Sequence, residues 1–310
     1  MDNVAIRTIV PLLLLIGMGV FSRRMRFLKS GDERVLSAYI YYFALPALFF
    51  VNMAETDFTG ETLRFICGGI TPIFAMLLIH TILHFMLKFP KNALYLLILN
   101  PVFGSESFFG IPFIMFASAT REGERLATLS ATSISVAAVT ISITVLELYK
   151  LERSAMSEGL KRVAKRLSKN PLILSILSGI LVSLIGIEIP SPISTSLHML
   201  GGTTSTVAIF MLGVFLYGRK YTNIAKALGL SLLRIVFLPI AALLITVPFN
   251  FPGLERSVLV LMHAMPVAVS MIVLSERYNF YKETIASLIL ISSIGAGLYL
   301  NLWLLSLGYP

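Results

Sequence analysis

The chain has 310 residues, of which 13% are charged and 56% hydrophobic, and its mean hydropathy is +0.86. Soluble domains carry about 25% charged residues, so this composition excludes a water-soluble fold and predicts an integral membrane protein. The single cysteine, Cys67, excludes a disulfide within the chain and a cysteine-based metal or iron–sulfur site, and we expect neither a cofactor nor a metal.

Apolar runs bounded by charged or turn-forming residues follow one another along the chain. A helix needs about 20 mostly apolar residues to cross a bilayer, and these runs lack the short alternation of barrel strands. We therefore predict an all-α polytopic protein with ten transmembrane helices, numbered here as spans one to ten. The runs cover residues 5–22, 35–53, 65–87, 93–119, 126–148, 171–188, 197–217, 227–249, 257–275 and 284–307.

Most lysine and arginine residues lie in the loops that follow odd-numbered spans. Because positive charge is retained on the cytoplasmic side, we predict that these loops are cytoplasmic and that both termini are external, in the cell (inner) membrane. The longest polar segment, residues 149–170, is interpreted as a basic cytoplasmic linker against lipid headgroups rather than a nucleic-acid or regulatory site. We thus assign the net charge of +9 to the membrane surface and expect no nucleic-acid partner.

This linker divides the chain into two halves of five spans, residues 1–148 and 171–310. Because five is odd, the second half enters the membrane from the opposite side. The two halves are therefore predicted to be inverted repeats, an arrangement that recurs among transporters.

Spans four and nine, which correspond in the two repeats, are both interrupted. Span four holds two prolines and two glycines between Asn100 and Pro112, and span nine holds Pro266. A proline frees backbone groups that a ligand or ion can then meet, although prolines such as Pro46, Pro72 and Pro239 are interpreted as simple kinks. We expect the substrate site at these breaks, formed by Ser105, Ser107, Gly110, Pro112, His263, Pro266, Val267 and Ser270.

Glu106 lies near the middle of span four. A carboxylate there costs about 2.5–3.5 kcal/mol on insertion scales, and a helix dipole returns only about 0.3–1 kcal/mol. Glu106 therefore needs a proton, a cation, a basic partner or a water-filled cavity, and we expect it to hold the coupling ion, H+ or Na+. The alternative is a structural carboxylate bound by backbone amides at the break.

Two further polar residues lie within spans. His263 would share one face of an unbroken helix with Pro266 and Ser270. It could act as a proton relay, as a partner for Glu106, or as a side chain bonded to a nearby carbonyl. Arg234 in span eight must face protein or water, and we interpret it as contacting an anionic side chain or a carbonyl rather than the substrate.

The chain resembles the auxin efflux carrier family, which includes plant PIN exporters and bacterial relatives labelled malonate-transporter-like. The resemblance extends over all ten spans and rests on short motifs in a fixed order. These are Ala44-Leu45-Pro46-Ala47-Leu48, Phe108-Phe109-Gly110-Ile111-Pro112, Lys169-Asn170-Pro171, Phe210-Met211-Leu212-Gly213-Val214, Met265-Pro266 and Leu274-Ser275-Glu276-Arg277-Tyr278.

The resemblance implies a fold like that of bile-acid/sodium symporters. Spans one, two, six and seven would form a scaffold, which in relatives makes homodimers, and spans three to five and eight to ten a transport domain that moves like an elevator. Spans four and nine would cross at the substrate. Family members usually carry Asn-Thr where this chain has Ser105 and Glu106, so the amide that would meet an anionic substrate is replaced.

We therefore expect a secondary transporter of a small organic solute, a carboxylate, and not an enzyme. Two alternatives are a membrane sensor on a transporter fold and, less favoured, an intramembrane enzyme. The enzyme reading lacks support because the only aspartates, Asp2, Asp32 and Asp57, all lie outside the spans and no HExxH motif occurs.

Overall fold

The computed structural model describes residues 4–150, 156–218, 221–268, 271, 275 and 278–308, and within them it is built of helices. The helical elements are α1 (Val4–Arg24), α2 (Glu33–Tyr39), η1 (Ile40–Ala44), α3 (Leu45–Ala54), α4 (Gly60–Leu87), α5 (Lys91–Val102), η2 (Glu106–Gly110), α6 (Ile111–Ser118), α7 (Arg121–Lys150), α8 (Met156–Leu167), α9 (Pro171–Ile185), α10 (Ser191–Leu216), α11 (Ile224–Leu232), η3 (Leu233–Phe237), α12 (Leu238–Phe249), α13 (Gly253–His263) and α15 (Lys282–Ser306).

Each of the ten apolar runs contains helix. By length and hydropathy, six helices of the described residues can cross a membrane: Glu33–Ala54, Gly60–Leu87, Arg121–Leu146, Ser191–Leu216, Ile224–Phe249 and Lys282–Ser306. A seventh would be the pair Lys161–Leu167 and Pro171–Ile185, which is bent by 64°. The chain is therefore an all-helical membrane protein.

Several helix ends differ from the predicted runs, and two of them have a clear local cause. Helix α10 begins at Ser191, before the expected residue 197, because Pro192 suits a first helical turn, where a missing N–H costs nothing. Helix α9 ends at Ile185, before the expected residue 188, because Gly186 adopts φ +73°, a left-handed conformation that terminates a helix.

The predicted linker is largely helical. Helix α7 continues to Lys150, and α8 covers Met156–Leu167, whereas residues 151–155 lie outside the described residues. Arg166 of α8 donates a hydrogen bond to the Tyr278 hydroxyl, and its guanidinium lies 5.3 Å from the centre of that ring. The linker is thus attached to the segment that follows α13.

Three turns within the described residues widen to π-helix, and each is followed by a proline. Segments η1, η2 and η3 end two residues before Pro46, Pro112 and Pro239. A proline cannot donate to the carbonyl four residues earlier and its ring clashes with that carbonyl, so the preceding turn opens. The prolines interpreted as kinks at positions 46 and 239 therefore do more than bend a helix: they change the register of the turn before them.

Glycines allow two pairs of helices to pack closely. A Cβ on Gly19 of α1 would lie 2.1 Å from the Phe210 carbonyl oxygen on α10, and a Cβ on Gly213 of α10 would lie 2.0 Å from the Ile16 carbonyl oxygen. On α9, a Cβ on Gly179 would lie 2.5 Å from the Phe50 oxygen of α3. The backbones of α1 and α10, and of α3 and α9, are thus in direct contact, as is usual where small residues line a membrane-helix interface.

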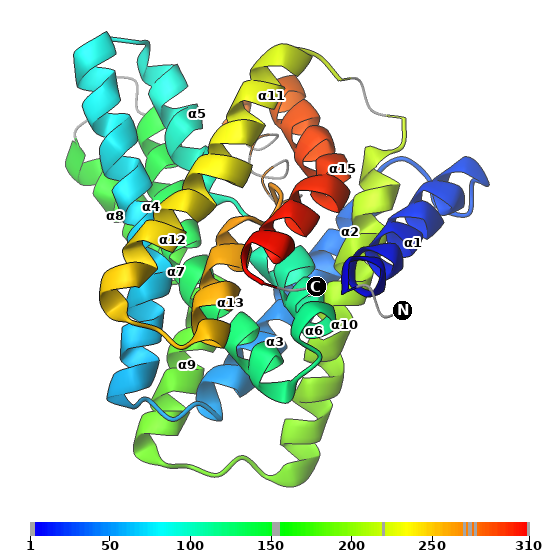
Figure 1. Cartoon of the computed structure of the whole chain (residues 1–310), viewed down its shortest axis with the longest axis vertical. Helices are drawn as coiled ribbons and strands as arrows, with labels where there is room; N and C mark the ends of the chain where they lie inside the picture. Colours follow the sequence, from blue (N-terminus) through cyan, green and yellow to red (C-terminus); the bar gives the residue numbers. More distant parts are fainter. Residues whose placement is uncertain are drawn as a thin grey trace.

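Helix α13 lies in the interior. Its side chains from Ser257 to His263 are all buried, against α4, α7, α12, α15 and η2. Figure 1 shows α13 between α12 and α6, while α1 and α10 run side by side at the edge of the molecule. Because this central helix stops at His263, its end lies inside the protein rather than at a surface.

The 30 residues of α7 define two ends of the molecule, about 45 Å apart. Near its start, Arg125 interacts electrostatically with Glu122, with Asp57 before α4 and with Glu255 at the start of α13. The connections after spans two, four and eight therefore meet at one end.

At the other end of α7, the Tyr149 ring packs edge-on against Phe280, at 4.8 Å between centroids, and near Tyr95 at 6.1 Å. Lys226 lies 4.6 Å from the centre of the Tyr281 ring. This end thus gathers segments near the connections after spans three, five, seven and nine.

Large apolar side chains remain exposed on the outer helices, among them Phe85 on α4 at 75% and Leu298 on α15 at 72%. Apolar surface on this scale marks a region covered by lipid or by another protein. The outside of the helix bundle is therefore suited to a bilayer.

Candidate functional site

The two breaks meet in the interior and pair as short antiparallel segments. Helix α5 ends at Val102 and α13 at His263, and beyond them Gly104 and Val267 form an antiparallel bridge. The Ser105 amide donates to the Pro266 carbonyl at 2.8 Å, and the Ala268 amide donates to the Phe103 carbonyl at 2.9 Å. Each break therefore supplies hydrogen-bond partners for the other, as buried backbone groups require.

Another amide of the paired segments, that of Val267, is bound by α15. The Val267 amide donates to the Ser292 hydroxyl at 3.1 Å, and Ser292 itself is completely buried. A third helix therefore fixes the position of the paired segments.

Arg234 of η3 joins both breaks. Its Nε donates to the Met265 carbonyl at 2.8 Å, and its Nη1 donates to the carbonyls of Asn100 and Pro101 at 2.9 and 2.7 Å. The Asn100 and Pro101 carbonyls lie in the last turn of α5, and the Met265 carbonyl lies two residues beyond the end of α13. The guanidinium thus satisfies acceptors that the two interrupted helices leave without helical partners.

The same guanidinium forms a buried ion pair with Glu106. Arg234 Nη2 lies 2.7 Å from Glu106 Oε1, and the two side chains are 0% and 4% exposed. Of the four options that the sequence left for Glu106, this structure shows the basic partner. Two opposite charges can share a dry interior when they are in contact and hydrogen-bonded.

Gly104 makes room for this pair. A Cβ at residue 104 would lie 1.6 Å from Arg234 Nη2 and 1.7 Å from Glu106 Oε1, distances at which no side chain fits. The glycine of the broken segment is therefore required by the approach of the two charged groups to the backbone.

The other predicted residues of span four lie at the same place. Ser105, Glu106, Ser107 and Gly110 are buried, and Pro112 occupies the first turn of α6. A Cβ on Gly110 would lie 2.8 Å from the Met262 sulfur, so this glycine brings η2 close to α13. The predicted residues Pro266 and Val267 take part directly in the pairing, as described above.

His263 points elsewhere. Its Nε2 lies 2.8 Å from the Gly69 carbonyl of α4, and since a carbonyl only accepts, Nε2 carries the proton. Of the three roles considered for His263, the structure shows the side chain bonded to a carbonyl. The helical face that it would share with Pro266 in an unbroken helix does not form, because α13 ends at His263. Ser270 lies outside the described residues.

Two residues of this site were not assigned to it from the sequence. Arg234 was recognised as needing a protein partner, but a charge inside a span does not reveal which break it reaches. Asn100 is completely buried, and its Nδ2 donates to the Leu230 carbonyl at 2.7 Å, which ties α5 to α11. The sequence offered one signal for Arg234 and Asn100: within their spans, both lie at about the same membrane depth as the prolines of spans four and nine.

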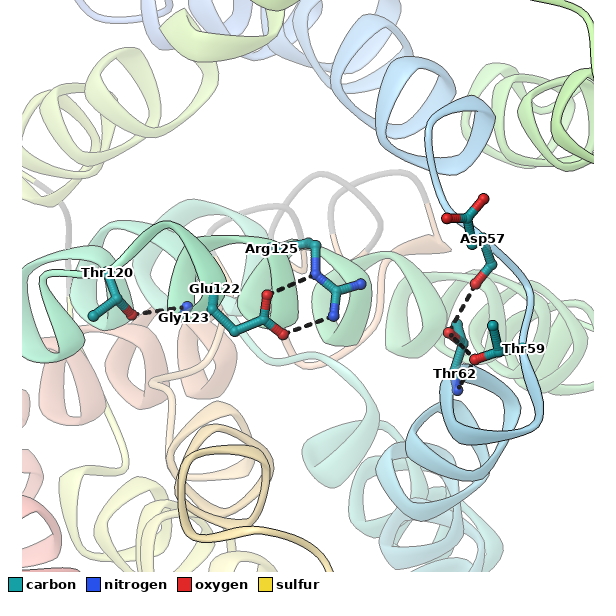
Figure 2. Close-up of polar contacts among 7 residues, drawn as sticks. All are labelled: Asp57, Thr59, Thr62, Thr120, Glu122, Gly123 and Arg125. Atoms are coloured by element: carbon teal, nitrogen blue, oxygen red, sulfur yellow. Dashed lines mark hydrogen bonds and ion pairs between the residues drawn. The ribbon is translucent and has the colours of Figure 1, made fainter.

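Polar contacts at the ends of α4 and α7 are different in kind. The Thr59 hydroxyl accepts from the Thr62 amide at 3.2 Å, and the Thr120 hydroxyl accepts from the Gly123 amide at 3.1 Å (Figure 2). Both are caps on helix N-termini. Nearby, Glu122 and Arg125 form an exposed ion pair, so these groups stabilise helix ends and do not belong to the candidate site.

Comparison with known proteins matches this chain to membrane transporters. Residues 4–304 match the family model described as "Membrane transport protein". The uncharacterized transporter YfdV of Escherichia coli is 24% identical over 96% of this chain and 95% of its own, and the uncharacterized transporter MJ1031 of Methanocaldococcus jannaschii is 27% identical over 95% and 96%. A putative malonate transporter of Rhizobium meliloti is 24% identical over 43% of this chain and 42% of its own.

The family match extends over nearly the whole chain and agrees with the predicted resemblance to the auxin efflux carriers. The protein belongs to the membrane transport protein family.

Proposed function

We propose that this protein is a secondary transporter that carries a small organic solute, a carboxylate, through the place where the two breaks pair. The observation that carries the proposal is the antiparallel bridge between Gly104 and Val267, with the buried Glu106–Arg234 pair beside it. Helices interrupted at membrane depth and held by charged groups are where transporters bind substrates and ions. The putative malonate transporter among the relatives supports a carboxylate as the solute class.

The proposed architecture is ten spans in two inverted repeats. Helix α1 packs on α10 and α3 packs on α9, which pairs span one with seven and span two with six. Spans one and two of the first repeat correspond to spans six and seven of the second. The pair of spans one and seven therefore corresponds to the pair of spans six and two. Likewise α4 packs on α12, which pairs span three with eight, and the breaks of spans four and nine pair with each other. This reciprocity supports a pseudo-two-fold relation.

The proposed mechanism is elevator-type alternating access in a cytoplasmic membrane. Spans one, two, six and seven would form a fixed scaffold, through which two copies associate, and spans three to five and eight to ten would move with the solute. The glycine contacts of α1 with α10 and of α3 with α9 support a rigid scaffold. The packing of α13 against α4, α7, α12 and α15 supports a moving unit that stays together.

Ser105, Ser107 and Val267 would line the solute site, Gly110, Pro112 and Pro266 would shape it, and Glu106 would couple movement to H+ or Na+. His263 and Ser270 complete the set predicted from the sequence, but the bond from His263 to Gly69 suits a positioning role. Segments near the odd-numbered connections gather at one end of α7 and segments near even-numbered connections at the other, which supports a common side for the odd-numbered loops. The lysine and arginine residues of these loops would make that side cytoplasmic.

The proposal is tested in proteoliposomes. Purified protein is reconstituted, and uptake of radiolabelled acetate, benzoate, malonate and succinate is measured with a pH gradient, a sodium gradient or neither. The proposal expects saturable uptake of at least one acid, accelerated by one gradient. Tight binding without flux would overturn the proposal and favour a membrane sensor. The absence of both binding and flux for all four acids would also overturn it.

A further inference from the structure

Arg234 is anchored independently of Glu106. Three of its four hydrogen bonds run to backbone carbonyls, those of Asn100, Pro101 and Met265, and only the bond from Nη2 to Glu106 Oε1 involves a side chain. A guanidinium held in this way keeps its position and its charge when the carboxylate leaves it. The Glu106 carboxylate is therefore the replaceable partner of a fixed cation.

Glu106 also stands at the point where an anionic solute would be bound. Its carboxylate lies beside the bridge between Gly104 and Val267, on the one strongly basic group that reaches both breaks among the described residues. A carboxylate is the natural ligand of a guanidinium, and Glu106 already presents one.

We propose, as an extension of the transport function above, that Glu106 is an internal substitute for the substrate carboxylate, exchanging with it on Arg234 and taking up one proton as it leaves. The solute's carboxylate then accepts the hydrogen bond from Arg234 Nη2, while Glu106 becomes a neutral carboxylic acid.

The exchange conserves charge. Before it, the site holds a guanidinium and an ionised Glu106; after it, the site holds the guanidinium, the solute carboxylate and neutral Glu106. The single new covalent bond is the O–H bond on Glu106, made with a proton from the same aqueous side as the solute. Without that proton, two carboxylates would share one guanidinium and leave a net negative charge in a buried site, which is strongly unfavourable. One carboxylate and one proton therefore move together.

A proton fits this site better than a sodium ion. A cation beside Glu106 would also lie beside the positive charge of Arg234, 2.7 Å from the shared oxygen. Protonation adds no second cation to the site, because it neutralises the carboxylate and leaves Arg234 to the solute.

The other titratable groups near the pair are already engaged. His263 on α13 is bonded to the Gly69 carbonyl, and Tyr299 on α15 donates to the Ser292 carbonyl at 3.2 Å. The elements α6, α7 and α10 also pack against η2. Helix α6 carries no ionisable side chain, α7 carries its charged residues at its two ends, and α10 carries only His198 near its start. Glu106 is thus the group in position to take the proton.

The test measures binding of acetate and benzoate, each beside its neutral amide, to detergent-purified protein between pH 5 and 8. For the wild type, affinity should fall about tenfold per pH unit where Glu106 is ionised, since one proton must enter with each acid. Glu106→Gln should remove this slope and bind the acids at least as tightly at pH 8. Glu122→Gln, the same change in an exposed pair, should keep the pH dependence that the wild type shows for the acids. The affinity for the neutral amides should not depend on pH.

A second measurement needs no variant. Titration calorimetry of the wild type in two buffers of different ionisation enthalpy should show one proton taken up per acid bound. Binding with no proton uptake, or an unchanged slope in Glu106→Gln, would overturn the exchange while leaving the transport function in place. A wild type that neither binds nor transports any acid would overturn both proposals.

Discussion

Two glutamate–arginine pairs in this protein have the same length and different surroundings. Glu122 and Arg125 are 2.7 Å apart and 52% exposed each, whereas Glu106 and Arg234 are 2.7 Å apart and 4% and 0% exposed. The first pair lies within one turn of α7 (Figure 2), and the second joins residues 128 positions apart. Distance alone therefore does not distinguish a surface contact from the group that holds two broken helices together.

The energetics of the two environments differ in a way that can be measured. An exposed pair contributes about 0–1 kcal/mol, because water competes for both charges. A buried pair adds little net stability when intact, yet removing one partner costs about 3–5 kcal/mol because the other charge is left without compensation. Substitutions at the two sites should therefore change the free energy of unfolding by different amounts.

The largest effect is expected for Arg234→Met. This change leaves the Glu106 carboxylate buried without a cation and removes the donors to the carbonyls of Met265, Asn100 and Pro101. We expect the apparent free energy of unfolding, measured by denaturant titration in detergent, to fall by about 3–5 kcal/mol. The double variant Arg234→Met/Glu106→Leu should recover part of this loss, and a single variant as stable as the wild type would contradict the burial of an uncompensated charge.

Gly104→Ala should have the next largest effect. The added Cβ would overlap both Arg234 Nη2 and Glu106 Oε1, at 1.6 and 1.7 Å, so the pair must separate or the break must shift. We expect a loss of about 1–3 kcal/mol in the same titration.

The matched control for that change is Gly229→Ala on α11, the helix that leads into η3. A Cβ there meets no described heavy atom within 4 Å, and alanine is the better helix former, so stability should stay equal or rise slightly. Equal losses at the two glycines would mean that the Arg234–Glu106 approach is not what requires Gly104.

Glu122→Gln should have the smallest effect. The pair with Arg125 is exposed and local, so the free energy of unfolding should change by less than about 1 kcal/mol, and less in high salt. The same substitution at Glu106 keeps a hydrogen-bonding group but leaves the buried Arg234 without its charge partner, so the loss should exceed that at Glu122 and stay below that of Arg234→Met. Measuring both in parallel sharpens the comparison, and an inverted order would refute it.

The broken segments could be predicted from the sequence because prolines, glycines and polar residues interrupt otherwise apolar runs. The signal is local: Pro101 lies at the end of α5 with Gly104 just after it, and Pro266 lies just beyond the end of α13, so the pattern alone indicates where these two helices stop. The helical coverage of the ten runs was predictable for the same reason, since each run is long and apolar.

The contact partners of the interrupted segments could not be predicted from the sequence. Glu106 required a partner, and a proton, a cation, Arg234 or water would each have satisfied it, because charge balance does not specify position. Glu106 and Arg234 both lie in π turns, before Pro112 and Pro239, and the direction of a side chain in such a turn does not follow from an α-helical pattern. The three roles considered for His263 could not be separated from the sequence, because the carbonyl that it contacts, that of Gly69, lies on another helix.

The central claim, that a solute reaches the paired breaks, is tested most directly by substrate protection of a cysteine. Ser105→Cys is introduced with Cys67→Ser, so that the chain holds one thiol, and labelling by a small maleimide is followed in proteoliposomes with and without a transported acid. Glu188→Cys, in the exposed turn between α9 and α10, is the matched control. The account predicts that a saturating acid slows labelling at residue 105 severalfold and leaves residue 188 unchanged. Equal rates at residue 105 with and without the acid would contradict it.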